Sequence, residues 1–104
     1  MLEIATLKIA RVIMLAREYG ADSPRLHRWL EGLNEDEAVS LVALMWIGRE
    51  TYGPDELEEA KRVAAEEASA PAADYLSGEP ALPDYLEAGL DALGIDVTDV
   101  EENY

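Results

Sequence analysis

The sequence predicts an all-α fold, a compact bundle of four to five helices, and three observations lead to it. Apolar residues recur every three to four positions over long stretches. No segment alternates apolar and polar residues for long, and no Asn-Gly or Asp-Gly pair marks a β-hairpin. Most of the 7 glycines and all 5 prolines fall at or near the expected helix ends.

The first two helices are predicted by periodicity and by their end signals. Apolar residues at helical spacing indicate a helix over about residues 3–19, and Gly20 favours a stop because glycine accepts the left-handed conformation. A shorter helix is expected over about residues 24–32. Ser23 is a good N-cap for it, and Pro24 fits the first helical position, where its missing N–H costs nothing.

The third helix is predicted to be the centre of the bundle. Asn34 and Glu37 have the spacing of a capping box, which marks a helix start. The stretch 38–47 that follows is apolar on all sides except at Ser40. Because a helix without a polar face belongs inside a protein, we expect a central apolar helix near residues 35–48.

The second half of the chain is predicted to hold two more helices and a short turn segment. A helix with a thin apolar stripe is expected over about residues 54–70, and one or two further turns over 71–78. The last helix is expected over about residues 80–93. Gly89 interrupts it at a cost of about 1 kcal/mol relative to alanine, which predicts a close approach of another helix.

The length of 104 residues fits one domain. We expect a single helical domain over residues 1–94 and an acidic, frayed tail over 95–104. The chain has 23 acidic and 8 basic residues, a formal net charge of −15. The charge is uneven, because residues 53–104 hold 15 acidic and 2 basic side chains.

Composition excludes several classes of function. The negative charge argues against nucleic acid and anionic membrane as partners, since both are bound through Lys and Arg. The absence of cysteine excludes disulfides and thiolate metal sites. The longest uncharged run, 38–48, is shorter than the roughly 20 residues that span a bilayer, and Glu3 precedes any basic residue, unlike in a signal peptide. We therefore expect a cytoplasmic protein.

Four residues are candidates for an interaction site: Trp46, Arg49, Tyr75 and Tyr85. Trp46 offers an aromatic platform and Arg49 a guanidinium near a helix end, while the two tyrosines could present hydroxyls at a groove. The alternative is structural, with the aromatic rings in the core and Arg49 answering the helix dipole or an acid. No catalytic, cofactor-binding or metal-binding residue is expected, because no known motif is present and the single imidazole, His27, is expected on the surface.

Two strings carry a resemblance to a known family. One runs from Leu33-Asn34-Glu35-Asp36-Glu37 into Leu41-Val42-Ala43-Leu44-Met45-Trp46-Ile47-Gly48-Arg49. The other is Tyr75-Leu76-x-Gly78-x-Pro80 followed by Asp84-Tyr85-Leu86-Glu87-x-Gly89-Leu90. Together they resemble a family of small bacterial proteins, chiefly proteobacterial, that is known only as a domain of unknown function. The resemblance covers residues 26–94 and implies a helical domain in a bacterial cytoplasm, with no activity attached.

The sequence favours a non-enzymatic protein–protein interaction or regulatory module. Its partner is unknown, and the acidic surface makes a basic protein one alternative. A homodimer is another, because a chain of this length can leave part of the apolar stretch 38–47 uncovered. Two further hypotheses stay open: a nucleic-acid mimic that inhibits a basic DNA- or RNA-binding protein, and an enzyme with carboxylate chemistry. The enzyme would need a polar pocket where two acids meet Arg49, His27 or a tyrosine.

Overall fold

The structure is a computed structural model that describes residues 2–67 and 71–95. Its elements in chain order are α1 (Thr6–Tyr19), α2 (Pro24–Glu31), α3 (Glu35–Gly48), the 3₁₀ helix η1 (Pro54–Glu56), α4 (Leu57–Glu66), α5 (Ala72–Ser77) and α6 (Leu82–Ala92). Every regular element in these residues is a helix, so the predicted all-α class is confirmed. The expected tail beyond residue 95 and the end of the fourth helix at 68–70 lie outside the described residues.

The predicted count of four to five helices is wrong, because the described residues form six α-helices and a 3₁₀ turn. The difference lies in the segment predicted as one or two turns, which forms α5 between Pro71 and Gly78. A helix this short is marginal by itself. It is held by packing, since Ala73 and Leu76 are buried and α5 contacts both α2 and α3.

The first helix also starts later than expected, at Thr6. The preceding segment lies against α3 instead of continuing the helix. The Glu3 N–H donates to the buried Ser40 hydroxyl at 2.8 Å, and Ile4 is buried in the core. Ser40, the polar interruption of the apolar stretch, is therefore satisfied by the backbone of the N-terminal segment.

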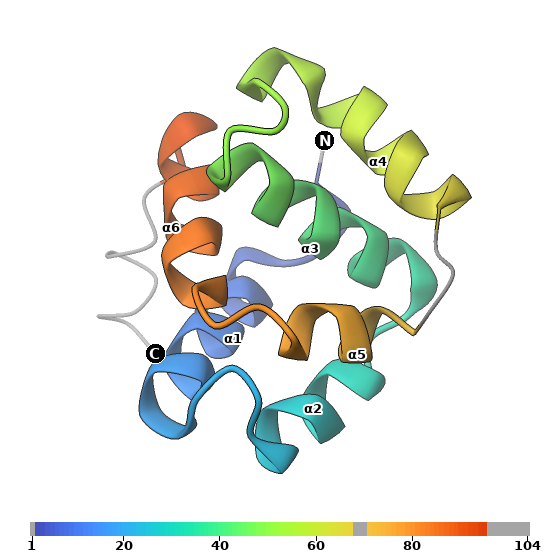
Figure 1. The fold of residues 1–104 in the computed structure, drawn as a ribbon. Coiled ribbons are helices and arrows are strands. Elements are labelled where there is room, and N and C mark those ends of the chain that lie inside the picture. The colour runs from blue at the N-terminus through green and yellow to red at the C-terminus, as the bar shows by residue number, and fades with distance from the viewer. Residues whose placement is uncertain (1, 68–70, 96–104) are drawn as a thin grey trace.

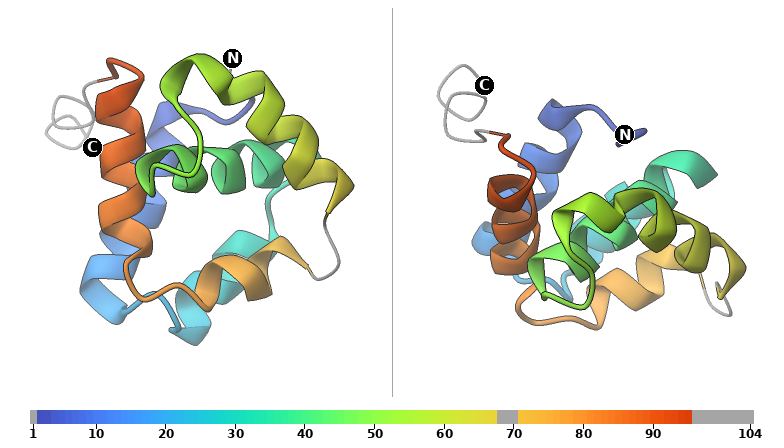
Figure 2. Two further views of the ribbon diagram at one scale, coloured as in Figure 1. Left: turned by 45° about the horizontal axis from the view of Figure 1, so that its top comes forward. Right: turned by 90° about the horizontal axis from the view of Figure 1, so that it is seen from above.

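Helix α3 crosses the middle of the view in Figure 1, with α4, α5 and α6 around it. All three of these helices contact it, and α6 does so most extensively. The views in Figure 2 show α5 running beside α2 under α3, while α4 covers another side of α3. The main apolar core is built from all six α-helices, with α4 contributing Ala64. A smaller cluster between α3 and the start of α4 contains Ala43, Ile47, Leu57 and Ala60.

The starts of α2 and α3 are capped as the sequence predicts. The Ser23 hydroxyl accepts the Leu26 N–H at 3.1 Å. At α3 both capping-box bonds form: the Glu37 N–H donates to Asn34 Oδ1 at 2.8 Å, and the Asn34 N–H donates to Glu37 Oε1 at 3.0 Å. Lys8 of α1 also binds the Glu37 carboxylate, at 2.5 Å, so this cap joins α1 to α3.

Two glycines let α3 and α6 approach each other closely. A Cβ atom on Gly89 would lie 2.5 Å from the Leu44 carbonyl oxygen, and one on Gly48 would lie 1.7 Å from the Tyr85 carbonyl oxygen. Both distances are far below van der Waals contact. The predicted close approach at Gly89 is therefore confirmed, and Gly48 has the same role on the facing helix.

Within residues 2–67 and 71–95, no helix combines the length and the apolar character that crossing a bilayer requires.

Candidate functional site

The four candidate interaction residues lie around one end of α3. Trp46 is in its last turn, and Arg49 directly follows its last residue. Tyr75 reaches Trp46 from α5, and the main chain at Tyr85 of α6 lies against Gly48. The structure thus brings candidates from two separate strings of the sequence to the C-terminal end of α3.

This end of α3 is closed by a Schellman motif, a cap of two backbone hydrogen bonds. The Thr51 N–H donates to the Trp46 carbonyl oxygen at 2.9 Å, and the Glu50 N–H donates to the Ile47 carbonyl oxygen at 3.0 Å. The motif needs one left-handed residue, and Glu50 takes that conformation with a φ of 66°. The left-handed conformation costs a residue other than glycine about 1–2 kcal/mol, so the backbone at Glu50, four residues after Trp46, is strained.

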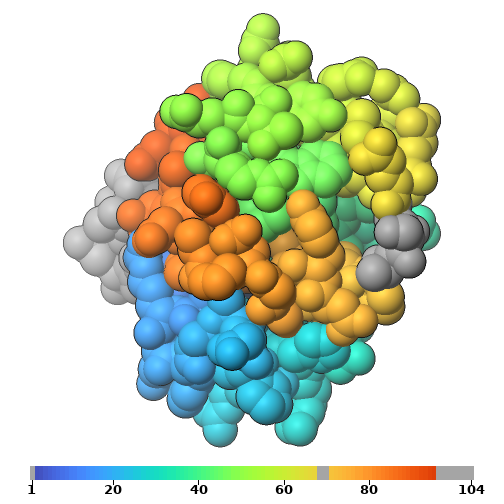
Figure 3. All heavy atoms as spheres, in the orientation of Figure 1, coloured from blue at the N-terminus to red at the C-terminus, as the bar shows by residue number. Residues whose placement is uncertain are grey.

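Three aromatic side chains meet beside this cap, and we call Trp46, Tyr52 and Tyr75 the aromatic patch. The Trp46 and Tyr52 rings stack with centroids 5.8 Å apart and planes inclined by 26°. The Trp46 indole Nε1–H donates to the Tyr75 hydroxyl at 2.8 Å, and Tyr75 is 42% exposed. In Figure 3 the segment after α3 (green) and α5 (amber) adjoin on the face toward the viewer.

Arg49 is exposed at the edge of the aromatic patch. Its Nε–H donates to the Thr51 hydroxyl at 3.2 Å. Among the described residues, no carboxylate lies within ion-pair distance of its guanidinium. By contrast, Arg17 of α1 binds Glu87 of α6 at 2.9 Å, and this hydrogen bond raises the pKa of Arg17. Arg49 thus keeps its terminal nitrogens available for another acceptor.

Tyr85 belongs to this end of α3 mainly through its main chain. Its ring is half-buried and packs against the main core. Its carbonyl oxygen occupies the space that a side chain on Gly48 would need. Its surroundings fit the structural alternative, and those of Trp46 fit it in part, because Trp46 is half-buried and packs against both apolar clusters.

His27 of α2 joins two carboxylates at the surface. Its Nε2 lies 2.6 Å from Asp74 Oδ1 of α5, and its Nδ1 lies 3.4 Å from Glu31 Oε1. The hydrogen bond to Asp74 is the main cause that raises the pKa of His27. The imidazole ring is therefore an ion-pair bridge between α2 and α5, and its side chain is 32% exposed.

Sequence reasoning missed two residues of this region, Tyr52 and Asp74. Tyr52 lies between Gly48 and Pro54, two helix-breaking residues that mark a loop. An aromatic residue in a loop so close to Trp46 could have indicated a contact between the two rings. Asp74 is 47 positions away from His27 and had no local signal.

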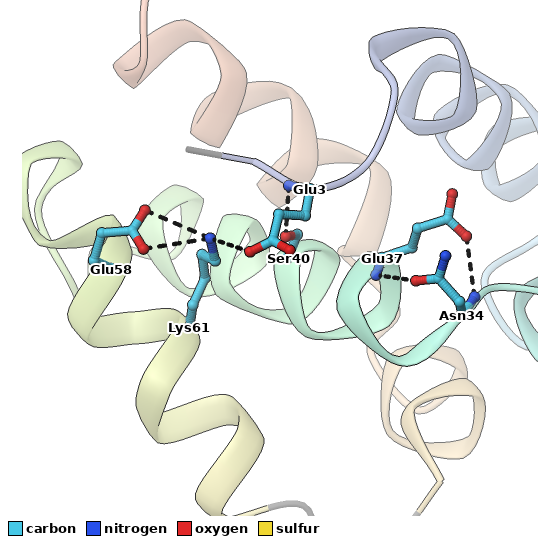
Figure 4. Close-up of polar contacts among 6 residues, drawn as sticks. All are labelled: Glu3, Asn34, Glu37, Ser40, Glu58 and Lys61. Atoms are coloured by element: carbon cyan, nitrogen blue, oxygen red, sulfur yellow. Dashed lines mark hydrogen bonds and ion pairs between the residues drawn. The ribbon is translucent and has the colours of Figure 1, made fainter.

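A second polar cluster ties the N-terminal segment to α4 (Figure 4). Lys61 Nζ lies 2.9 Å from Glu3 Oε1 and 3.4 Å from Glu58 Oε1, and its side chain is largely buried. The hydrogen bond to Glu3 is the main cause that raises the pKa of Lys61. Since Glu3 also binds Ser40 through its backbone, the cluster fastens the start of the chain to α3 and α4.

Metal-binding clusters and surface hollows are two further kinds of feature that could form a site in the described residues. No three His, Asp or Glu side chains of residues 2–67 and 71–95 gather closely enough to hold a metal ion. Two surface hollows have volumes of about 430 and 310 Å³. The larger is lined by Gly20, Ala21, Asp22, Ser77, Gly78 and Pro80, and the smaller by Leu2, Ile4, Thr6, Leu57, Leu93 and Ile95. Neither is lined by His27 or by the aromatic patch.

Comparison with known proteins assigns the chain to a family. Nothing among the curated proteins or the solved structures matches it. The model of DUF3775, a protein of unknown function, matches residues 23–95, from the N-cap of α2 to the residue that closes the cap of α6. This range is more than half of the chain and includes the aromatic patch, Arg49 and His27. The chain therefore belongs to the DUF3775 family of proteins of unknown function.

Proposed function

We propose that the chain is a non-enzymatic interaction or regulatory module that binds a protein partner through the aromatic patch and Arg49. The observation that carries this proposal is the stack of Trp46 on Tyr52, with the half-exposed Tyr75 hydrogen-bonded to its edge. Trp, Tyr and Arg are the side chains that most often dominate the energy of protein interfaces.

The geometry of the patch favours binding at low entropic cost. Trp46 projects from a helix whose other residues are mostly buried, and its indole N–H is already satisfied by Tyr75. A surface fixed in this way loses little conformational freedom when a partner docks. Arg49 adds specificity, because its terminal nitrogens can bind a carboxylate of the partner in a bidentate pair.

The charge of the molecule favours a partner that is basic overall. With a formal net charge of −15, long-range attraction raises the association rate with a positive surface and repels acidic ones. The proposed complex therefore combines a local aromatic contact with a general electrostatic attraction, and added salt should slow its formation.

Affinity capture from the source organism, using matched tyrosine variants, tests the proposal. Tyr75→Ala removes a patch residue, and Tyr19→Ala removes a tyrosine of nearly equal exposure, 43% against 42%, at the end of α1. We expect Tyr75→Ala to weaken binding of the captured partner about tenfold or more, as loss of an interface hot spot does, and Tyr19→Ala to bind as the wild type. Equal capture by the two variants would contradict the proposal.

Arginine variants provide an independent test of the same surface. Arg49→Gln should weaken the captured complex, whereas Arg28→Gln, an exposed arginine on α2, should change only the salt dependence of the association rate. Equal losses in both variants would indicate that only total charge matters, and the aromatic patch would then not be the docking site.

A second copy of the chain is an alternative partner, although two copies that each carry a formal net charge of −15 repel each other at long range. Leu41, Leu44 and Met45 of α3 are covered within one chain, so these side chains offer no surface for a dimer. A homodimer would instead use the aromatic patch. Sedimentation at micromolar concentration that finds only an 11.4 kDa species would reject it.

A nucleic-acid mimic is the second candidate function, and one observation favours it. Lys61 and Arg62, the two basic residues of the region 53–104, are both bound by carboxylates, Lys61 by Glu3 and Glu58 and Arg62 by Glu59 and Glu66. The second half therefore presents an anionic field with no free cation from its own sequence. Duplex DNA added to the capture experiment should then displace the partner, and capture unchanged by DNA would speak against mimicry.

The source and the cellular location of the protein are also part of the proposal. We infer a bacterial source from the resemblance of the two strings, and a cytoplasmic location from the composition and the absence of cysteine. Expression of a tagged chain in its source organism, followed by cell fractionation, tests the location directly.

A further inference from the structure

We propose that His27 is a pH-sensitive clamp on α5: gain of a proton tightens its contact with Asp74, and loss of the proton lets α5 shift and carries Tyr75 away from Trp46. This inference rests on the proposed function, because Tyr75 belongs to the aromatic patch. It adds a regulation of that site which neither the family match nor the sequence motifs contain.

Helix α5 has little stability of its own. It has six residues, no side chain caps its N-terminus, and its last residue is followed directly by Gly78. Isolated helices of this length do not form in water, so contacts with other elements must hold it. Those contacts are the buried Ala73 and Leu76, the Tyr75–Trp46 hydrogen bond and the Asp74–His27 pair.

Two carboxylates are the charged groups in contact with His27. Asp74 reaches it from α5 and Glu31 from one turn further along α2 itself. Helix α1 also packs against α2, and its titratable side chain in contact there is Tyr19, whose hydroxyl and ring bind Arg25. The described surroundings of the imidazole are therefore two carboxylates.

The protonation state of His27 changes its interaction with the two carboxylates. Protonated His27 donates its Nε2–H to Asp74 and carries the positive charge that both carboxylates attract. Neutral His27 has one N–H, so one ring nitrogen then directs a lone pair at a carboxylate. The hydrogen bond to Asp74 raises the pKa of His27 above its ordinary value, and the clamp is thus held below that pKa and released as pH rises through it.

Helix α5 connects the clamp to the aromatic patch. Asp74 and Tyr75 are consecutive residues of α5, and the Tyr75 hydroxyl accepts the Trp46 indole N–H at 2.8 Å. A shift of α5 that lengthens the Asp74 contact must therefore disturb the Tyr75 contact as well. The fluorescence of Trp46 reports that disturbance without any partner present.

The experiment follows the same titration with two probes in the full chain. A Trp29→Phe background leaves Trp46 as the sole tryptophan, and because His27 is the single histidine its imidazole Cε1 proton gives an unambiguous NMR signal. Between about pH 5 and 9 we expect both probes to show one transition with the same midpoint, above the ordinary histidine value of about 6.5. A Trp46 signal that stays flat while His27 titrates would overturn the proposal.

Four variants identify the route of the coupling. Asp74→Asn should lower the His27 midpoint toward about 6.5 and remove the fluorescence transition. Tyr75→Phe should remove the fluorescence transition and leave the His27 titration in place, because only the second contact is lost. Asp91→Asn, at an exposed position of α6, is the control and should change neither. A fluorescence transition that survives in His27→Gln would assign the pH response to another group.

The outcomes also separate this inference from the proposed function. Coupling between His27 and Trp46 in the free protein, together with normal partner capture by Tyr75→Ala, would retain the clamp and reject the docking site. Flat fluorescence with loss of capture in Tyr75→Ala would retain the docking site and reject the clamp.

Discussion

Helices α3 and α6 end with the same two backbone hydrogen bonds but place different residues in the left-handed position. At α6 the Ile95 N–H donates to the Leu90 carbonyl oxygen at 2.8 Å, and Gly94 is left-handed with a φ of 76°. At α3 the equivalent residue is Glu50, with a φ of 66°. Glycine adopts this conformation without the steric penalty that a side chain brings, so the cap of α6 is relaxed and the cap of α3 is strained.

Glycine has two roles at these helix ends, which are to allow a close helix crossing and to adopt the left-handed cap conformation. At α3 glycine is used for the crossing and not for the cap. The C-terminal glycine of α3, Gly48, lies where α6 crosses, and a side chain there would overlap the Tyr85 carbonyl oxygen. Helix α6 has one glycine for the crossing, Gly89, and another for its cap. Because the strained cap of α3 carries the aromatic patch and that of α6 does not, the strain lies at the site we propose to be functional.

The largest expected effect comes from filling the crossing at α3. A Cβ on Gly48 would lie 1.7 Å from the Tyr85 carbonyl oxygen and 2.9 Å from the Gly89 backbone nitrogen. Backbone atoms cannot rotate away as a side chain end can, so Gly48→Ala should separate the helices and lower the free energy of unfolding by about 3 kcal/mol or more. Urea denaturation measures this, and a loss below about 1 kcal/mol would contradict the close crossing.

Gly89→Ala should have the next largest effect. Its Cβ would lie 2.5 Å from the Leu44 carbonyl oxygen, a less severe overlap, and alanine also gains about 1 kcal/mol of helix propensity. We expect a net loss of about 1–2 kcal/mol in urea denaturation. Gly78→Ala is the matched control, because its Cβ would meet only ordinary contacts at 3.5 Å. Equal effects at Gly89 and Gly78 would show that crowding is not the cause.

Gly94→Ala measures the cost of the left-handed conformation alone, without a steric overlap. Nothing lies within 4 Å of the position of a Cβ there, so the change introduces strain without an overlap. We expect it to lower the free energy of unfolding by about 1 kcal/mol. The cap of α6 would then have a left-handed residue with a side chain, as the cap of α3 does. Thermal unfolding that shows no change would mean that the left-handed residue of this cap is not constrained.

The sequence predicts much of the fold because most signals are local. The N-caps at Ser23 and Asn34 and the close approach at Gly89 were visible as residue types at fixed spacings. Helix α5 was predicted only as one or two turns because its stability comes from α2 and α3, which no local pattern contains. The N-terminal segment likewise leaves the helical pattern to bind Ser40, 37 positions away from Glu3.

The candidate site was predicted in part for the same reason. Trp46 and Arg49 are marked by their place at the end of an apolar helix, but their surroundings depend on residues distant in sequence. Tyr75 lies 29 positions from Trp46, and the pairing of His27 with Asp74 spans 47. Chemistry-bearing residue types could be chosen from the sequence, whereas their partners required the packing of α5.

The smallest expected effect is a gain, and it tests the comparison from the opposite side. Glu50→Gly places at α3 the residue that α6 already has, and removes the left-handed penalty of about 1–2 kcal/mol. Glycine also makes the unfolded chain more flexible, which offsets part of the gain by roughly 0.5–1 kcal/mol. We therefore expect a net stabilisation of up to about 1 kcal/mol, measured by urea denaturation.

A side-chain series at Glu50 separates strain from charge. Glu50→Asn should stabilise the protein as well, because asparagine tolerates the left-handed conformation, whereas Glu50→Ala loses the charge and keeps the strain. Stabilisation by asparagine and glycine but not by alanine would assign the effect to the backbone. An equal gain in all three variants would assign it to relief of charge repulsion, and the two caps would then not differ in strain.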